Sequence, residues 1–209
     1  MRRKSYSLLL CAALILSLCA CGSPVPQPDS GTLQIVTTIF PIYDWTRTVL
    51  GDSGGAELTW MLDRGVDMHS YQPTVGDMLK ISSCDVFIYV GGESDAWVED
   101  ALAGAVTPDM VVIDLLDVLG GAAKEEEAVE GMAQEANDGG DPEYDEHVWL
   151  SVRNAGTLVQ SILTSVQSID PANAKTYESN ASAYMDKLNL LDEEYKTTVS
   201  NASLHTVLF

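Results

Sequence analysis

Short apolar runs that alternate with helix-like stretches constrain the fold of this chain more than any other feature. The run 86–90, Val-Phe-Ile-Tyr-Val, is continuously apolar, which is typical of a parallel strand covered on both faces. Similar runs lie at 33–37, 58–62 and 111–113, with helix-like stretches between them at 43–50, 75–82 and 96–103. Strands that alternate with helices predict an α/β fold with a parallel sheet.

A second helical region follows this alternating part. Ser151 is a plausible N-cap for a helix over 152–167, and Asp170-Pro171 resembles the start of a second helix. From there an apolar stripe recurs every three or four residues without Gly or Pro, so the helix can run to Ser200, about 45 Å at 1.5 Å per residue. A helix of this length suggests a rigid connection between two separate parts of the molecule. The apolar residues 206–209 then predict the first strand of a second lobe, in a sequence we interpret as truncated.

The N-terminus has the pattern of a bacterial lipoprotein signal. Three basic residues precede an apolar run over 8–20, too short to span a bilayer comfortably. The run ends in Leu18-Cys19-Ala20-Cys21, which resembles a lipobox, so we expect Cys21 to be the first mature residue and to carry lipid. An ordinary signal peptide with incidental cysteines is the alternative. Residues rich in Pro, Ser and Gly follow as a tether, and the remaining Cys84 is expected to be buried.

The chain is strongly acidic, with a formal net charge of −20. Such a surface repels nucleic acid and anionic lipid. It suits an extracytoplasmic protein that handles a cation, although general solubility is the alternative explanation. Residues 124–146 hold ten acids and one lysine, and we expect a mobile loop there, because the segment can bury little.

Two of the three histidines stand in similar contexts. His69 follows the run 58–62 and precedes a helix start at Thr74, and His147 lies between the acidic segment and Ser151, beside Trp149. Neutral imidazole is a common ligand for zinc and related metals. Each histidine alone could be an ordinary surface residue, but the two contexts together, in this order, favour metal ligands.

From about residue 33 to the end, the chain resembles the zinc/manganese solute-binding lipoproteins of ABC transporters. The matching stretches are Ile-Val-Thr-Thr-Ile-Phe-Pro-Ile-Tyr-Asp at 35–44, the His69 and His147 motifs, Ser-Cys-Asp-Val-Phe-Ile-Tyr-Val-Gly-Gly at 83–92, and Asp-Pro at 170–171 with Tyr177 and Asn180. The resemblance implies a two-lobed periplasmic-binding-protein-like fold joined by one long helix, with metal held between the lobes. The corresponding divisions are a signal peptide over 1–20, a tether over 21–32, an N-terminal lobe over 33–168, a linker helix over 169–200 and the start of a second lobe over 201–209.

The resemblance also implies a function. The protein would capture Zn²⁺, or alternatively Mn²⁺, outside the cytoplasm while lipid-anchored to the bacterial cell membrane, which means the periplasm in a two-membrane host. It would deliver the metal to an ABC transporter permease. His69 and His147 match the first two ligands of the family, whereas its third and fourth ligands would lie beyond Phe209, so His205 is expected not to bind metal. The sequence departs from the family at Asp67-Met68-His69, where Asp-Pro-His is usual.

Two other functions compete with this interpretation. A surface adhesin is a role often ascribed to similar lipoproteins, although nothing in the residues favours it. A metallohydrolase could use two histidines as half of a catalytic site, but the chain lacks the His-Glu-x-x-His and Gly-x-Ser-x-Gly motifs. We therefore expect a binding protein and not an enzyme.

Overall fold

A four-stranded parallel sheet organises the protein, as the alternating pattern predicts. The computed structural model describes residues 31–52, 55–125 and 144–206. The strands are β1 (Leu33–Thr37), β2 (Ala56–Trp60), β3 (Val86–Tyr89) and β4 (Val111–Asp114), in the order β2-β1-β3-β4. Because β2 and β3 flank β1, the loops that follow these strands meet at one edge of the sheet.

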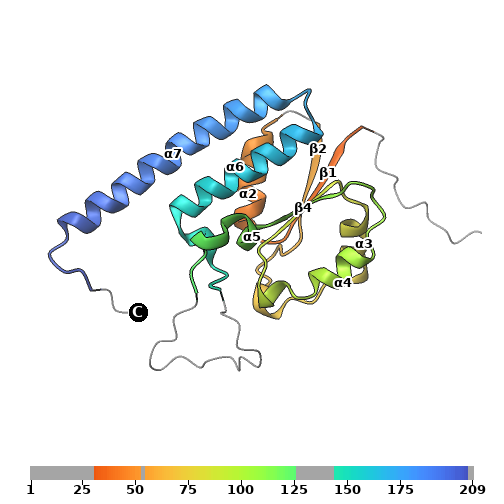
Figure 1. Cartoon of the computed structure of the whole chain (residues 1–209), viewed down its shortest axis with the longest axis horizontal. Helices are drawn as coiled ribbons and strands as arrows, with labels where there is room; N and C mark the ends of the chain where they lie inside the picture. Colours follow the sequence, from red (N-terminus) through yellow and green to blue (C-terminus); the bar gives the residue numbers. More distant parts are fainter. Residues whose placement is uncertain (1–30, 53–54, 126–143, 207–209) are drawn as a thin grey trace, which may run out of the picture. The chain divides into compact units, whose positions relative to one another are not determined.

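Helices cover both faces of the sheet (Figure 1). On one side lie α3 (Val75–Ser83) and α4 (Val98–Ala103), which contact each other. On the other side α2 (Phe40–Leu50), α6 (Val152–Ile169) and α7 (Ala174–Asn201) pack together, and α5 (Leu115–Leu119) joins them against α6. Three short 3₁₀ turns matter for the site: η1 (Met68–Ser70), η2 (Glu93–Asp95) and η4 (Val148–Leu150).

The core lies between the sheet and these helices. Phe87 and Ile88 of β3 are fully buried, as are Ile42 of α2 and Leu158 of α6, which confirms that this strand is covered on both faces. Cys84 is a free, buried thiol whose pKa is raised to about 12, chiefly by burial. It is a small core residue, as predicted, and not a reactive thiol.

Two of the expected helix caps are present. At the start of α3, the Thr74 hydroxyl accepts a hydrogen bond from Asp77 N at 3.2 Å, and the Asp77 carboxylate accepts one from Thr74 N at 3.0 Å. Ser151 accepts a hydrogen bond from Asn154 N at the start of α6. These caps fix where the helices begin, immediately after the segments that carry the two histidines.

The predicted start of the long helix at Pro171 is wrong by three residues. The helix α7 begins at Ala174, with Asn173 as its N-cap. The Asp170 carboxylate instead accepts hydrogen bonds from Tyr177 OH at 2.6 Å and from Asn173 Nδ2 at 2.8 Å. This side chain therefore braces the turn between α6 and α7 rather than capping a helix.

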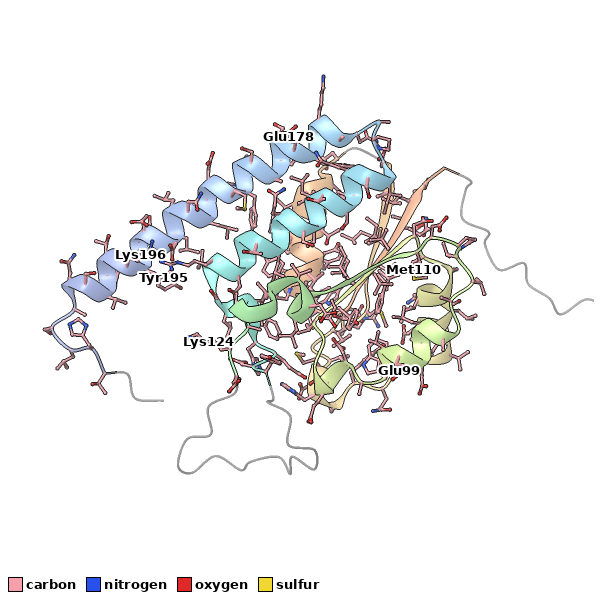
Figure 2. All side chains as sticks on the ribbon, in the orientation of Figure 1. Glu99, Met110, Lys124, Glu178, Tyr195 and Lys196 are labelled. Carbon is pink, nitrogen blue, oxygen red and sulfur yellow. The ribbon has the colours of Figure 1, made fainter. Side chains whose placement is uncertain are left out.

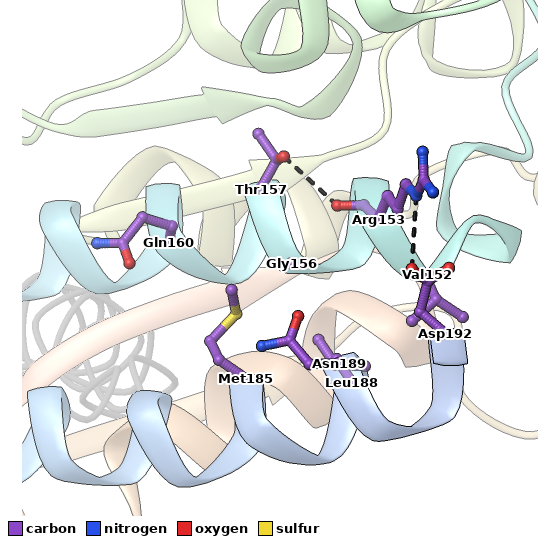
Figure 3. A pocket seen from close by; sticks show the side chains of 9 residues that line it. All are labelled: Val152, Arg153, Gly156, Thr157, Gln160, Met185, Leu188, Asn189 and Asp192. Atoms are coloured by element: carbon purple, nitrogen blue, oxygen red, sulfur yellow. Dashed lines mark hydrogen bonds and ion pairs between the residues drawn. The ribbon is translucent and has the colours of Figure 1, made fainter. Parts of the chain in front are cut away.

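The two halves of α7 have different surroundings. In the first half Tyr177 and Ala181 are buried, and at Gly156 of α6 the Met185 side chain approaches closely across a groove of about 440 Å³ (Figure 3). In the second half Leu190, Leu191, Tyr195 and Val199 are exposed, and Figure 2 shows Tyr195 and Lys196 on the part of α7 that extends past α6. The long helix is thus only partly covered by the described part of the chain.

Three expectations fall outside the described residues. They concern the leader with Cys21, the acidic segment over 126–143, and the final strand, of which only Thr206 is described. In the described ranges, no helix is both long enough and apolar enough to cross a membrane.

Candidate metal site

The two histidines lie where the loops after β2 and β3 and the segment before α6 come together. His69 lies in η1, which follows β2, and His147 immediately precedes η4. Their ring centroids are 5.4 Å apart although the residues are 78 positions apart in sequence. Open parallel sheets bind ligands at this carboxyl edge, so the fold places both predicted ligands at the expected side.

The same local hydrogen bond, from the histidine backbone to an aspartate carboxylate, is present at both histidines. The Asp67 carboxylate accepts a hydrogen bond from His69 N at 3.1 Å, and the Asp145 carboxylate accepts one from His147 N at 2.9 Å. Each aspartate stands two residues before its histidine, and each segment then enters a 3₁₀ turn. The repeated Asp-x-His pattern in the sequence indicates this hydrogen bond at both sites, and it was missed.

The spacing of the rings suits a shared metal ion. A Zn–N bond of about 2.1 Å, with about 1.1 Å more to the ring centre, puts two tetrahedrally arranged imidazole centres about 5.2 Å apart. The observed separation is 5.4 Å, with the ring planes inclined by 44°. The side chains are 51% and 46% exposed. The separation of the ring centres therefore matches that of two imidazoles bound to one metal ion, and both rings are accessible from solvent.

The Nδ1 atom of each ring already has a partner. His147 Nδ1 lies 2.9 Å from Asp145 Oδ1, and His69 Nδ1 lies 2.9 Å from Ser94 Oγ. An ionised carboxylate can only accept, so in the neutral ring of His147 this contact places the proton on Nδ1 and leaves Nε2 unprotonated. Hydrogen bonding of the non-ligating nitrogen is the usual arrangement in histidine metal sites.

Two residues of the site were missed by sequence reasoning. Glu146 accepts a hydrogen bond from Ser94 N at 2.8 Å through Oε1. Its Oε2 is 3.9 Å from His69 Nδ1 and has no hydrogen-bond partner among the described residues. Ser94 and Glu146 are 52 positions apart, and no local pattern indicates such a contact. In a neutral His69 ring, the carboxylate beside Nδ1 favours the tautomer with the proton on that nitrogen.

The turn that carries Ser94 is built on a buried carboxylate. Asp95 is 7% exposed and accepts hydrogen bonds from Val90 N and Gly91 N at 2.9 and 3.1 Å. Its pKa is raised to about 6, mainly because burial disfavours the charged form, and the nearby Glu146 carboxylate adds to the shift. Gly92 has φ +81°, and a Cβ there would overlap Glu146. The glycine is required for this close approach.

The wall beside His147 is aromatic, as expected from the sequence. The Trp149 ring lies 5.3 Å from the His147 ring and is half-buried. By contrast His205 is exposed beyond the end of α7. Over the described ranges no set of three or more His, Cys, Asp and Glu residues is placed to hold a metal ion. Within these ranges, His69 and His147 are therefore the two side chains that we consider as candidate ligands.

The described fold is similar to that of metal-binding proteins of known structure. The zinc-bound ZnuA-like domain of AdcA from Streptococcus pneumoniae matches 83% of this chain with a TM-score of 0.64 and 31% identity. The metal-dependent lipoprotein YcdH from Bacillus subtilis matches 82% with a TM-score of 0.65 and 27% identity. In each case the chain covers 58% of the solved structure. The described fold is thus that of the ZnuA-like binding proteins.

The sequence agrees with this assignment. Residues 35–208 match the family model described as the periplasmic component A of the zinc-uptake complex, ZnuA, and the chain belongs to that family. Its relatives include the zinc-binding lipoprotein AdcA of S. pneumoniae, at 36% identity over 203 residues, and the high-affinity zinc uptake protein ZnuA of B. subtilis, at 30% over 209 residues. This family consists of solute-binding transport proteins and not enzymes.

The relatives are longer than this chain. The alignments take in 95% and 97% of the chain but 39% of the AdcA sequence and 64% of the ZnuA sequence. The region matched by the family model, 35–208, contains both histidines and every strand and helix described above except the first two residues of β1.

Proposed function

We propose that this protein is the extracytoplasmic receptor of an ABC importer, and that it captures Zn²⁺ with His69 and His147 and passes the metal to the membrane permease. The observation that carries the proposal is the histidine pair itself. The rings are spaced for one metal ion, and both Nδ1 atoms are occupied by hydrogen-bond partners. Membership in the ZnuA family supplies the transport context.

Two imidazoles alone complete half of a tetrahedral zinc shell. We propose that the remaining ligands come from a second lobe, corresponding to the part of the relatives that this chain does not span. The apolar second half of α7 supports this idea. Tyr177 and Ala181 begin an apolar stripe and are buried, whereas Leu191, Tyr195 and Val199 continue the same stripe and are exposed. In this proposal α7 joins the two lobes, and the metal lies between them.

Zinc is the favoured cargo. Two relatives are named for zinc, AdcA and ZnuA, and a related binding protein from Candidatus Liberibacter asiaticus was solved with manganese at 25% identity. Imidazole ligands suit zinc, whereas manganese prefers more oxygen donors. The ligands outside this chain would decide how strongly manganese competes.

Calorimetric titration of the full-length gene product with Zn²⁺ tests this function. His69→Ala and His147→Ala should each weaken binding at least 10-fold, since loss of a residue that merely orients a ligand already costs about 10–100-fold. His205→Ala is the matched control and should leave the affinity unchanged. Equal effects of all three substitutions, or no zinc binding by the wild type, would contradict the assignment.

A further inference from the structure

Ser94 connects the two segments that carry the histidines. Its hydroxyl is 2.9 Å from His69 Nδ1, and its backbone N–H donates a 2.8 Å hydrogen bond to Glu146, the residue before His147. The three residues lie on three separate segments, after β2, after β3 and before α6. One half-buried serine therefore contacts both sides of the histidine pair.

The direction of the Ser94–His69 hydrogen bond follows from the surroundings. A serine hydroxyl can donate or accept, so the hydroxyl alone does not select a tautomer. Glu146 Oε2 lies 3.9 Å from the same nitrogen, and its negative charge favours a proton on Nδ1. With Nδ1–H donating to Ser94 Oγ, Nε2 is unprotonated and can bind a metal ion. The opposite direction would put the proton on Nε2 and block that ligand.

The turn beneath Ser94 is suited to hold it in place. Asp95 is buried and bonded to two backbone amides at the end of β3. Gly91 and Gly92 both have positive φ, and at both positions a Cβ would collide with a carboxylate, of Asp114 and of Glu146 respectively. A side chain on so constrained a turn has little freedom to leave its partner.

We propose that Ser94 is a positioning residue of the metal site, which selects the Nδ1–H tautomer of His69 and fixes the distance between the His69 and His147 segments. The inference rests on the proposed metal-binding function. It adds that the site is preorganised before metal arrives, through a residue that does not touch the metal. Preorganisation raises affinity because fewer groups must be ordered on binding.

Nitrogen-15 NMR of the histidine rings in the metal-free, full-length protein tests the tautomer, at a pH where both rings are neutral. The wild type should show His69 protonated on Nδ1. Ser94→Ala should shift His69 toward the Nε2–H form, and Ser94→Thr, which retains the hydroxyl, should restore the wild-type spectrum. A wild-type His69 protonated on Nε2, or a tautomer that does not change in Ser94→Ala, would overturn the proposal.

Zinc titration of the same variants tests the consequence. Ser94→Ala should weaken Zn²⁺ binding about 10-fold, with recovery in Ser94→Thr. Ser83→Ala is the matched control, because the Ser83 hydroxyl bonds to Leu79 O within α3, remote from the site, and it should bind as the wild type does. Full affinity in Ser94→Ala would also refute the positioning role. A wild type that binds no zinc would refute the proposed function, and the tautomer measurement would still decide the hydrogen bond.

Discussion

At the residue scale, Asp95 shows how the site depends on a buried charge. The carboxylate is 7% exposed, yet it accepts two backbone hydrogen bonds that shape the turn after β3. Burial raises its pKa to about 6, and the two hydrogen bonds oppose this shift only in part. At neutral pH the turn therefore holds a charge that folding has removed from water.

This raised pKa has a definite consequence for stability. The pKa in the unfolded chain is near 3.8, so the folded protein binds more protons between pH 4 and 6. Stability contributed by Asp95 is fully present below pH 4 and is lost as pH rises through 6. A shift of about two units corresponds to about 3 kcal/mol at neutral pH.

Asp95→Asn should remove this contribution to the pH dependence of stability. The amide oxygen can still accept from Val90 N and Gly91 N, but no charge is buried. Urea unfolding of the metal-free protein should show the variant gaining up to about 3 kcal/mol over the wild type between pH 4 and 7.5. The control is Asp100→Asn on the exposed face of α4. Parallel pH curves for wild type and Asp95→Asn would contradict the assignment of the shift to Asp95.

At the element scale, the strands and the longer helices could be predicted because their signals are local, whereas the short helix α5 was not predicted. The run 33–37 is β1, and the runs at 86–90 and 111–113 differ from β3 and β4 by one residue, while the run 58–62 differs from β2 by two. The start of α7 could not be predicted, because Tyr177 draws the Asp170 side chain away from a capping role. That contact depends on the packing of α7 against the rest of the fold.

Some residues of the candidate metal site could likewise be predicted from local sequence motifs, and others could not. Sequence motifs identified His69 and His147, and the structure brings them together, but their role as ligands remains a prediction. Ser94 and Glu146 could not be identified, because their contacts join residues 25 and 52 positions apart. Such pairs are determined by how the loops after different strands meet, which no short pattern records.

The acidic segment 126–143 is predicted to contribute little to the stability of the fold. Its ends are paired, with a bridge between Glu125 and Tyr144 and a 2.9 Å hydrogen bond from Asp145 N to Lys124 O. Replacing 126–143 by a short Gly/Ser linker should change the free energy of unfolding by less than about 1 kcal/mol, because closure entropy varies slowly with loop length. The equilibrium affinity for zinc should also be unchanged.

Stopped-flow measurements of zinc binding test whether the carboxylates of that segment attract cations to the site or bind the metal directly. If its carboxylates raise the local cation concentration, the replacement should slow capture at low salt, and the difference should vanish at high salt. A Gly/Ser segment of the original length is the control, since it removes the charges alone. A large loss of equilibrium affinity would show that carboxylates of 126–143 are ligands.

At the scale of the whole molecule, we predict that the protein is anchored to the membrane. The lipobox-like Leu18-Cys19-Ala20-Cys21 predicts that the mature chain begins at a lipid-modified Cys21 and partitions with membranes. Mass spectrometry of the N-terminal peptide from the native host checks this. Cys21→Ala should release the protein from the membrane fraction while leaving zinc binding intact. An unmodified N-terminus at another residue would contradict the prediction.

The central claim is that one Zn²⁺ ion bridges His69 and His147, and a crystal structure of the zinc-loaded, full-length protein tests it most directly. Anomalous scattering at the zinc edge identifies the ion as zinc and locates it. The account predicts one strong peak about 2.1 Å from Nε2 of both histidines, with Ser94 and Asp145 still bonded to the two Nδ1 atoms. A peak that touches only one of these rings, or lies away from both, would contradict it.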